Sequence, residues 1–307
     1  MVVTAVARSE EVERVAPLIF FVVIVVAVLA AHRLSLAVVR HVVRRGPALI
    51  EKGAKSPLVA SVEKAGTRAL ASRPRLRAML SARLTPRRFT GLPLTLMVAA
   101  GVYILLLAGE ILEELLEADE LVALDQAVNR ILGSVRGWPT VDFFAWITVF
   151  GSSQTVTAVS LVMTAFLFAL RRVPYIVPLW ITVLGANATT WVGKYLIDRP
   201  RPDPVAGFFA LSPSFPSGHA TAATAVYGFL AYLVARELRG PRARFEVVFW
   251  TTVIIGLVGF SRMYLSLHYL SDVATGFLVG GFWLLVGFIV AEHRRTKIRS
   301  ASVDGSA

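Results

Sequence analysis

The sequence predicts an all-α fold, a polytopic transmembrane helical bundle with a six-helix core and one additional helix at the N-terminus. Of the 307 residues, 56% are apolar and only 17% are charged, whereas about a quarter of an average soluble domain is charged. The mean hydropathy is +0.66, and the apolar residues gather in blocks that basic residues flank. A soluble domain and a disordered chain are therefore excluded. The absence of cysteine excludes disulfide scaffolds, zinc fingers and thiolate catalysis.

Seven apolar blocks qualify as membrane spans, because a bilayer core needs about 20 apolar residues. They cover Val15–Ala31, Leu92–Gly109, Phe143–Leu170, Val173–Gly193, Ala220–Ala235, Val247–Ser261 and Val273–Ala291. The fifth and sixth reach full length only if the polar motifs at their ends enter the membrane interface. The first resembles a signal segment in length, but it lacks a basic leading region and a cleavage site, so we interpret it as an anchor.

The distribution of charge predicts the orientation of these spans. The stretch Arg33–Gly91 carries 14 Lys and Arg against 2 acids, whereas Glu110–Asp142 carries 8 acids and 2 arginines. Alternation of the spans puts the acidic stretch, which is expected to form a loop, and the N-terminus outside, and 24 of the 32 basic residues inside. Basic loops mark the cytoplasmic side, so this orientation is preferred over its inverse, and the basic pI does not indicate nucleic-acid binding.

Three regions follow from this pattern. Residues 1–91 are predicted to form an N-terminal anchor helix and a basic cytoplasmic linker, residues 92–291 the six-helix core, and residues 292–307 a basic cytoplasmic tail. Within the linker, Leu58–Leu84 mixes apolar and basic residues. It is either a set of amphipathic helices on anionic headgroups or a solvated linker.

Ionisable residues converge at the outer ends of four spans, where charges are costly and usually functional. By the predicted topology these residues lie at one depth, and they are Lys194, Arg201, His219, Arg262, His268 and Asp272.

The first of three motifs is the stretch from Lys194 to Pro202, KYLIDRPRP. Pro200 and Pro202 cannot continue a helix, so the helix is predicted to end near Ile197. Arg201 then lies on a loop seven residues from Lys194. Two such cations suit a phosphate, because arginine offers a fork of donors and lysine a point charge. The alternative is membrane anchoring by basic residues, but these two lie on the outside, against the charge rule.

The second motif is Pro216-Ser217-Gly218-His219, ahead of an apolar helix. Ser217 is a favourable N-cap, and Gly218 leaves the backbone amides open. Free N–H groups at a helix start attract phosphate, and His219 lies in the first turn. The alternative is that these residues only begin a helix.

The third motif is SRMYLSLHYLSD, which holds Arg262, His268 and Asp272. The histidine and the aspartate are four residues apart and are predicted to share a helix face. The carboxylate would fix one imidazole nitrogen and leave the other for nucleophilic attack or proton transfer, although a purely structural His–Asp pair has the same spacing. A metal held by the two histidines and Asp272 is disfavoured, because three cations already gather there.

Together and in this order, the three motifs resemble the signature of the type 2 phosphatidic acid phosphatase family of integral membrane lipid phosphatases, with every fixed position present. The resemblance covers about residues 92–291. It implies a metal-independent phosphatase without a cofactor. It also implies that His268 is the nucleophile that becomes phosphohistidine, that Asp272 orients it, and that His219 is the general acid and base. Lys194, Arg201 and Arg262 resemble the phosphate clamp, and Ser217 and Gly218 resemble additional phosphate donors.

The leading hypothesis is thus hydrolysis of a lipid phosphate at the outer leaflet of a bacterial inner membrane, acting on polyprenyl pyrophosphate, phosphatidylglycerophosphate or phosphatidate. The expected partners are this lipid and the bilayer, with no nucleic acid, and the sequence indicates no oligomeric state. A lipid phosphotransferase would use the same residues, and a non-catalytic lipid-headgroup binding protein would need only the cations. A vanadium-dependent haloperoxidase has a related anion site, but that chemistry requires no membrane.

Overall fold

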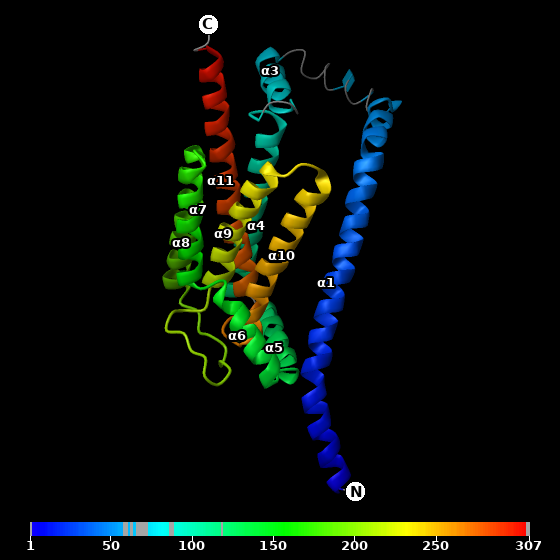
Figure 1. Cartoon of the computed structure of the whole chain (residues 1–307), viewed down its shortest axis with the longest axis vertical. Helices are drawn as coiled ribbons and strands as arrows, with labels where there is room; N and C mark the ends of the chain where they lie inside the picture. The colour runs from blue at the N-terminus through cyan, green and yellow to red at the C-terminus, as the bar shows by residue number, and fades with distance from the viewer. Residues whose placement is uncertain are drawn as a thin grey trace.

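The computed structural model of the chain describes residues 2–57, 61, 64, 65, 73–85, 89–117 and 119–304. These residues form helices joined by turns and loops, with no β-strand among them (Figure 1). The helices are α1 (Val2–Ala54), α3 (Pro74–Arg83), α4 (Leu92–Glu117), α5 (Asp119–Ser134), α6 (Trp138–Val149), α7 (Ser153–Ala169), the 3₁₀ turn η1 (Val173–Tyr175), α8 (Ile176–Ile197), α9 (Gly218–Glu237), α10 (Pro241–Tyr264) and α11 (Leu270–Asp304).

The prediction of a polytopic transmembrane bundle is confirmed. Among the described residues, six helices are long and apolar enough to cross a membrane: α1, α4, α8 with η1, α9, α10 and α11. The bent pair of α6 and α7 makes a seventh span if the two helices cross together.

The predicted span Phe143–Leu170 is not one straight helix. Its two halves, α6 and α7, meet at an angle of 41°, and the hydroxyl of Ser152 caps the start of α7. Gly151 lies at the break, where a Cβ would come within 2.5 Å of Val258 Cγ1 and 3.0 Å of His219 Cβ. The bend therefore lets this segment approach α9 and α10 closely beside a predicted site residue.

The acidic segment Glu110–Asp142 is largely helical, so the expectation of a loop there was wrong. Its first turns extend α4 to Glu117, and α5 follows almost at once. The apolar side of α5 packs through Leu132 into a cluster with the buried Tyr264 of α10. This helix escaped detection because it is amphipathic rather than uniformly apolar.

Helix α9 lies at the centre of the bundle and packs against α7, α8, α10 and α11. Its buried side chains include Ala223, Val226 and Phe229. On α11, a Cβ at Gly280 would lie 2.7 Å from Thr221 O, so the two backbones pass very close together. This contact fixes the start of α9 beside the start of α11, where two of the predicted motifs lie.

The segments before the core are only partly described. Helix α1 runs along α10 and α6, and His32 Nε2 lies 2.8 Å from Glu246 Oε2 of α10. Part of the predicted linker Leu58–Leu84 lies outside the described residues, and its described end forms α3. The predicted basic tail is helical as far as Asp304, because α11 continues without a break from the last span.

The two ends of the bundle differ in charge, as the predicted topology requires. The acidic α5 and the long α8–α9 loop lie at one end, and the basic α9–α10 turn and the C-terminus lie at the other (Figure 1). We name these the outer end and the inner end, after the predicted orientation.

Candidate active site

The three motifs meet in a cavity of about 230 Å³ at the outer end. Helix α8 ends there, α9 begins, α10 ends and α11 begins. The cavity is lined by the predicted residues Lys194, Arg201, Gly218, His219, Arg262 and His268, together with side chains of α7 and α8. Four helix ends that are far apart in the chain thus bring their polar groups to one place.

Lys194 and Arg201 are held by the loop that follows α8. The helix ends at Ile197, as the prolines predicted. The ammonium of Lys194, which is buried, donates to the carbonyl oxygen of Pro213. Arg201 donates to Ser212 O at 2.7 Å, and one of its nitrogens donates to the same Pro213 oxygen at 3.2 Å. The two cations therefore converge on one point of the loop.

The start of α9 offers a buried hydroxyl as well as backbone N–H groups. Ser217 occupies the N-cap position, but its side chain makes no capping bond, contrary to the expectation. Its Oγ is buried and has no hydrogen-bond partner among the described residues. Its backbone N–H donates to Asp272 O at 2.9 Å, which ties α9 to α11. A buried unpaired hydroxyl is costly unless a ligand satisfies it, so it suits a phosphate oxygen.

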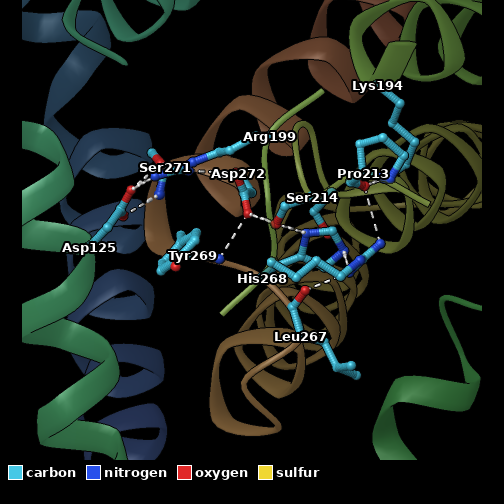
Figure 2. Close-up of polar contacts among 12 residues, drawn as sticks. Asp125, Lys194, Arg199, Pro213, Ser214, Leu267, His268, Tyr269, Ser271 and Asp272 are labelled. Carbon is cyan, nitrogen blue, oxygen red and sulfur yellow. Dashed lines mark hydrogen bonds and ion pairs between the residues drawn. The ribbon is translucent and has the colours of Figure 1, made fainter. Parts of the chain in front are cut away.

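His268 and Asp272 contact each other, but not across one helix face as predicted. His268 precedes the first residue of α11. Its Nδ1 lies 3.4 Å from Asp272 Oδ2 (Figure 2). Its Nε2 lies 3.1 Å from Arg201 Nη1. The same Oδ2 accepts from Tyr269 N at 2.9 Å and from the Ser214 hydroxyl. Asp272 thus reaches back to the start of its own helix, as in a capping box.

The imidazole of His268 is kept neutral. Burial lowers its pKa to about 3; the Asp272 carboxylate opposes this shift, and the cations Arg262 and Arg201 add to it. With Nδ1 directed at Asp272, the proton is assigned to Nδ1, and Nε2 keeps its lone pair toward Arg201 and the cavity.

Arg262 is the third cation of the cavity. Its guanidinium is almost fully buried, and one nitrogen donates to Thr148 Oγ1 at 2.8 Å. Its Nε is buried with no partner among the described residues. The arrangement therefore leaves donors from Arg262 and Ser217 unused, as an anion site requires.

The structure also contains a charged network that the sequence did not reveal. The guanidinium of Arg199 donates to Asp272 Oδ1 at 2.7 Å and to Asp125 Oδ2 of α5 at 2.8 Å (Figure 2). Arg199 is 8% exposed and Asp125 is 1% exposed. Asp125 also accepts from Ser271 N at 3.0 Å and from the Ser271 hydroxyl at 2.5 Å.

This network holds the Asp272 carboxylate on the side that faces away from His268. Burial alone would lower the pKa of Arg199, but the carboxylates of Asp272 and Asp125 raise it above its ordinary value. One oxygen of Asp272 faces Arg199 and the other faces His268. The sequence signal was an acid, Asp125, on the same side of α5 as the apolar Leu132.

Comparison with known proteins identifies the family of the chain. A sequence model of the PAP2 superfamily matches residues 175–296. Phosphatidylglycerophosphatase B of Bacillus subtilis (strain 168) is 31% identical over 168 residues, which are 53% of this chain and 82% of that protein. The crystal structure of a transmembrane PAP2 type phosphatidylglycerolphosphate phosphatase from Bacillus subtilis has a TM-score of 0.56 and 28% identity, covering 65% of this chain and 96% of that one. LpxE of Aquifex aeolicus has a TM-score of 0.44 and 21% identity, over 54% and 94% of the two chains. The chain therefore belongs to the PAP2 superfamily, and it is an integral membrane phosphatase.

Proposed function

We propose that this phosphatase removes a phosphate from a lipid headgroup through a phosphohistidine formed on His268. The observation that carries the proposal is the pair of contacts that the two ring nitrogens of that imidazole make. Its Nδ1 faces Asp272, and its Nε2 faces Arg201 at 3.1 Å on the wall of the cavity. A neutral, oriented nitrogen beside three cations suits attack on phosphorus.

In the first step, Nε2 attacks the phosphorus. The P–N bond forms as the P–O bond to the lipid breaks, and His219 donates a proton to the leaving oxygen. The transition state spreads negative charge over three equatorial oxygens. Lys194, Arg201 and Arg262 face this charge, and Gly218 opens the helix start that also faces it.

In the second step, water attacks the phosphohistidine. His219, now neutral, accepts a proton from the water as the new P–O bond forms and the P–N bond breaks. Orthophosphate leaves, and His268 recovers its lone pair. Each step returns His219 to the protonation state that the next one needs.

The expected substrate is a lipid with a terminal phosphate or pyrophosphate. The cavity lies at the ends of membrane spans, where a lipid keeps its tail in the bilayer while its headgroup reaches the cations. Phosphatidylglycerophosphate is the first candidate, because the relatives at 31% and 28% identity are named for it. Polyprenyl pyrophosphate and phosphatidate offer the same phosphate chemistry.

The test is release of phosphate by the purified protein in EDTA, measured on these three lipids and on a phosphodiester lipid as a control. We expect release from at least one of the three and none from the control. No release from any of them contradicts hydrolysis. Transfer of phosphate to an added lipid alcohol, in place of water, would support the phosphotransferase instead.

The pKa of His268 predicts how activity depends on pH. Because the pKa is about 3, lowering the pH from 8 to 5 leaves the nucleophile unprotonated. After correction for the substrate phosphate, whose second pKa is about 6, kcat/KM should show no titration of His268 between about pH 5 and pH 8. If the corrected pH profile of kcat/KM still showed a titration in that range, and its midpoint shifted in Asp272→Asn, the low pKa assigned to His268 would be wrong.

We also propose that the cavity faces the outside of the bacterial cytoplasmic membrane, with residues 1–91 as an anchor and linker and residues 292–307 as an inner tail. The chain has no cysteine, so single introduced cysteines report sidedness directly. Asp203→Cys at the outer end should react with an impermeant maleimide added to intact spheroplasts. Arg239→Cys in the inner turn is the matched control and should react only after lysis. The reverse pattern would invert the topology.

A further inference from the structure

A second cavity, of about 900 Å³, lies between α9, α10 and α11 toward the inner end. In Figure 1, α10 leans away from α11 in that direction. At the outer side the two helices touch, because a Cβ at Gly259 would lie 2.3 Å from Phe277 Cζ. One turn away, a Cβ at Gly256 would meet nothing within 4 Å. The helices thus diverge into a wedge, which we name the inner groove.

The sides of the inner groove are mainly apolar. On α10, Val248, Thr252 and Gly256 are four residues apart, so they lie on one face, and all three are exposed. Across the gap, α9 contributes mostly small side chains together with Tyr232, and α11 contributes large ones, among them Leu284 and Phe288. Above its mouth the groove is also lined by Gly228 and Ala231 of α9, Ile255 of α10 and Phe277 of α11. The volume lies in the range of about 300–1,000 Å³ that is usual for ligand pockets.

The mouth of the inner groove is basic. Arg236, Arg244 and Arg295 lie there, one from each of the three helices. Glu292 pairs with Arg236 and lies 3.6 Å from Arg295. Arg244 donates to Leu238 O at 3.1 Å, and no carboxylate among the described residues pairs with it. Two guanidinium groups therefore share one carboxylate and the third has none among the described residues, which leaves an excess of positive charge.

An apolar trough that ends in excess positive charge matches one class of molecule. An acyl chain fits the trough, and a phosphodiester with a net negative charge fits the mouth, where arginine is the preferred partner of phosphate. A zwitterionic headgroup would bring its own cation against the arginines. We propose that the inner groove binds one anionic phospholipid of the leaflet opposite the catalytic cavity, at a site separate from the substrate site.

This lipid would fill the wedge that α9, α10 and α11 leave open. The same three helices carry His219, Arg262 and Asp272 at their other ends, so an occupant of the groove fixes the tilt of α10 relative to the helices of the nucleophile and the acid. The choice of leaflet rests on the orientation proposed above. The site itself does not depend on phosphatase activity.

The first measurement is binding to the purified protein by native mass spectrometry and thermal unfolding. Phosphatidylglycerol is compared with phosphatidylethanolamine of the same acyl chains, with orthovanadate present to occupy the catalytic cations. We expect phosphatidylglycerol to bind at least about tenfold more tightly and to raise the melting temperature. Equal binding of the two lipids would overturn the proposal.

Two glycine variants locate the site. Gly256→Leu projects a side chain into the groove, toward its mouth, because helical leucine points to the preceding turn. Gly109→Leu on α4 is the matched control, since a Cβ there also meets nothing within 4 Å. Both substitutions gain helix propensity alike. We expect the apparent Kd for phosphatidylglycerol to rise at least about tenfold in Gly256→Leu and to stay unchanged in Gly109→Leu. Equal affinity for phosphatidylglycerol in the two variants would contradict the location of the lipid site in the inner groove.

A charge variant tests the mouth. The double substitution Arg244→Gln and Arg295→Gln should remove the preference for phosphatidylglycerol while binding of the acyl chain persists. Retained preference would overturn the assignment of the headgroup. If Gly256→Leu dissociated a dimer and did not change lipid binding, the occupant of the groove would be a second copy of the chain. That result would also overturn the proposal. Protein that binds the lipid yet hydrolyses nothing would leave this inference standing while the proposed function failed.

Discussion

Replacing His268 with alanine should lower kcat for phosphate release at least about 10³-fold, because the reaction then lacks its nucleophile. His268 is 3% exposed, and its replacement leaves the cations Lys194, Arg201 and Arg262 in place, so binding of the lipid should persist. The measurement is kcat and KM in detergent on the preferred lipid. The exposed His293 at the inner end provides the control, since His293→Ala should retain full activity.

The covalent intermediate separates this mechanism from direct attack by water. Wild-type protein that is mixed with ³²P-labelled substrate and quenched in base should retain label on His268. His219→Ala should lose about 10²–10⁴-fold in turnover. It should nevertheless accumulate the labelled intermediate from para-nitrophenyl phosphate, whose leaving group needs no acid. Turnover that survives in His268→Ala would rule out the assigned nucleophile.

Replacing Asp125 with alanine should destabilise the protein by about 3–5 kcal/mol, which is typical when one partner of a buried ion pair is removed. Arg199 would keep only Asp272 as a counter-ion, and Ser271 would lose the acceptor for its N–H and its hydroxyl. Arg199 would then be held by Asp272 alone, which should shift the Asp272 carboxylate relative to His268. We therefore expect kcat to fall as well. Thermal unfolding in detergent and kcat on the same preparation measure the two effects.

Two variants on the same residue and helix sharpen this test. Asp125→Asn keeps an acceptor for Ser271 but removes the charge, so its loss of stability should be smaller than that of the alanine variant. The exposed Glu120 of α5 is the control, and Glu120→Ala should change stability by no more than about 0.5 kcal/mol. If Asp125→Ala behaved like Glu120→Ala, the network would have no role in holding Asp272.

Local chemistry made much of the site predictable. Two prolines set the end of α8 at Ile197, and the spans set the depth at which the motifs lie. Lys194, Arg201, His219, Arg262 and His268 therefore line one cavity, as expected. Their catalytic roles remain predictions for the variants above.

The remainder of the site depends on contacts that no local pattern records. Arg199 meets Asp125 across 74 positions of the chain, and Asp125 meets Ser271 across 146. The break at Gly151 depends on how closely α10 and α9 approach it. Helix α5 mixes apolar residues with charged and other polar residues, so its sequence does not stand out as an apolar span. Such features follow from packing, which the sequence determines only through the whole fold.

The way in which the loop holds Lys194 and Arg201 has a kinetic consequence. Their partners in the loop are the carbonyl oxygens of Pro213 and Ser212, which are dipoles without net charge. The positive charge of these cations is therefore available to any phosphate that enters. Orthophosphate presents the same oxygens as the headgroup it came from, and it is attracted by the same charges. We therefore expect free phosphate to inhibit the enzyme, so that turnover slows as the product accumulates.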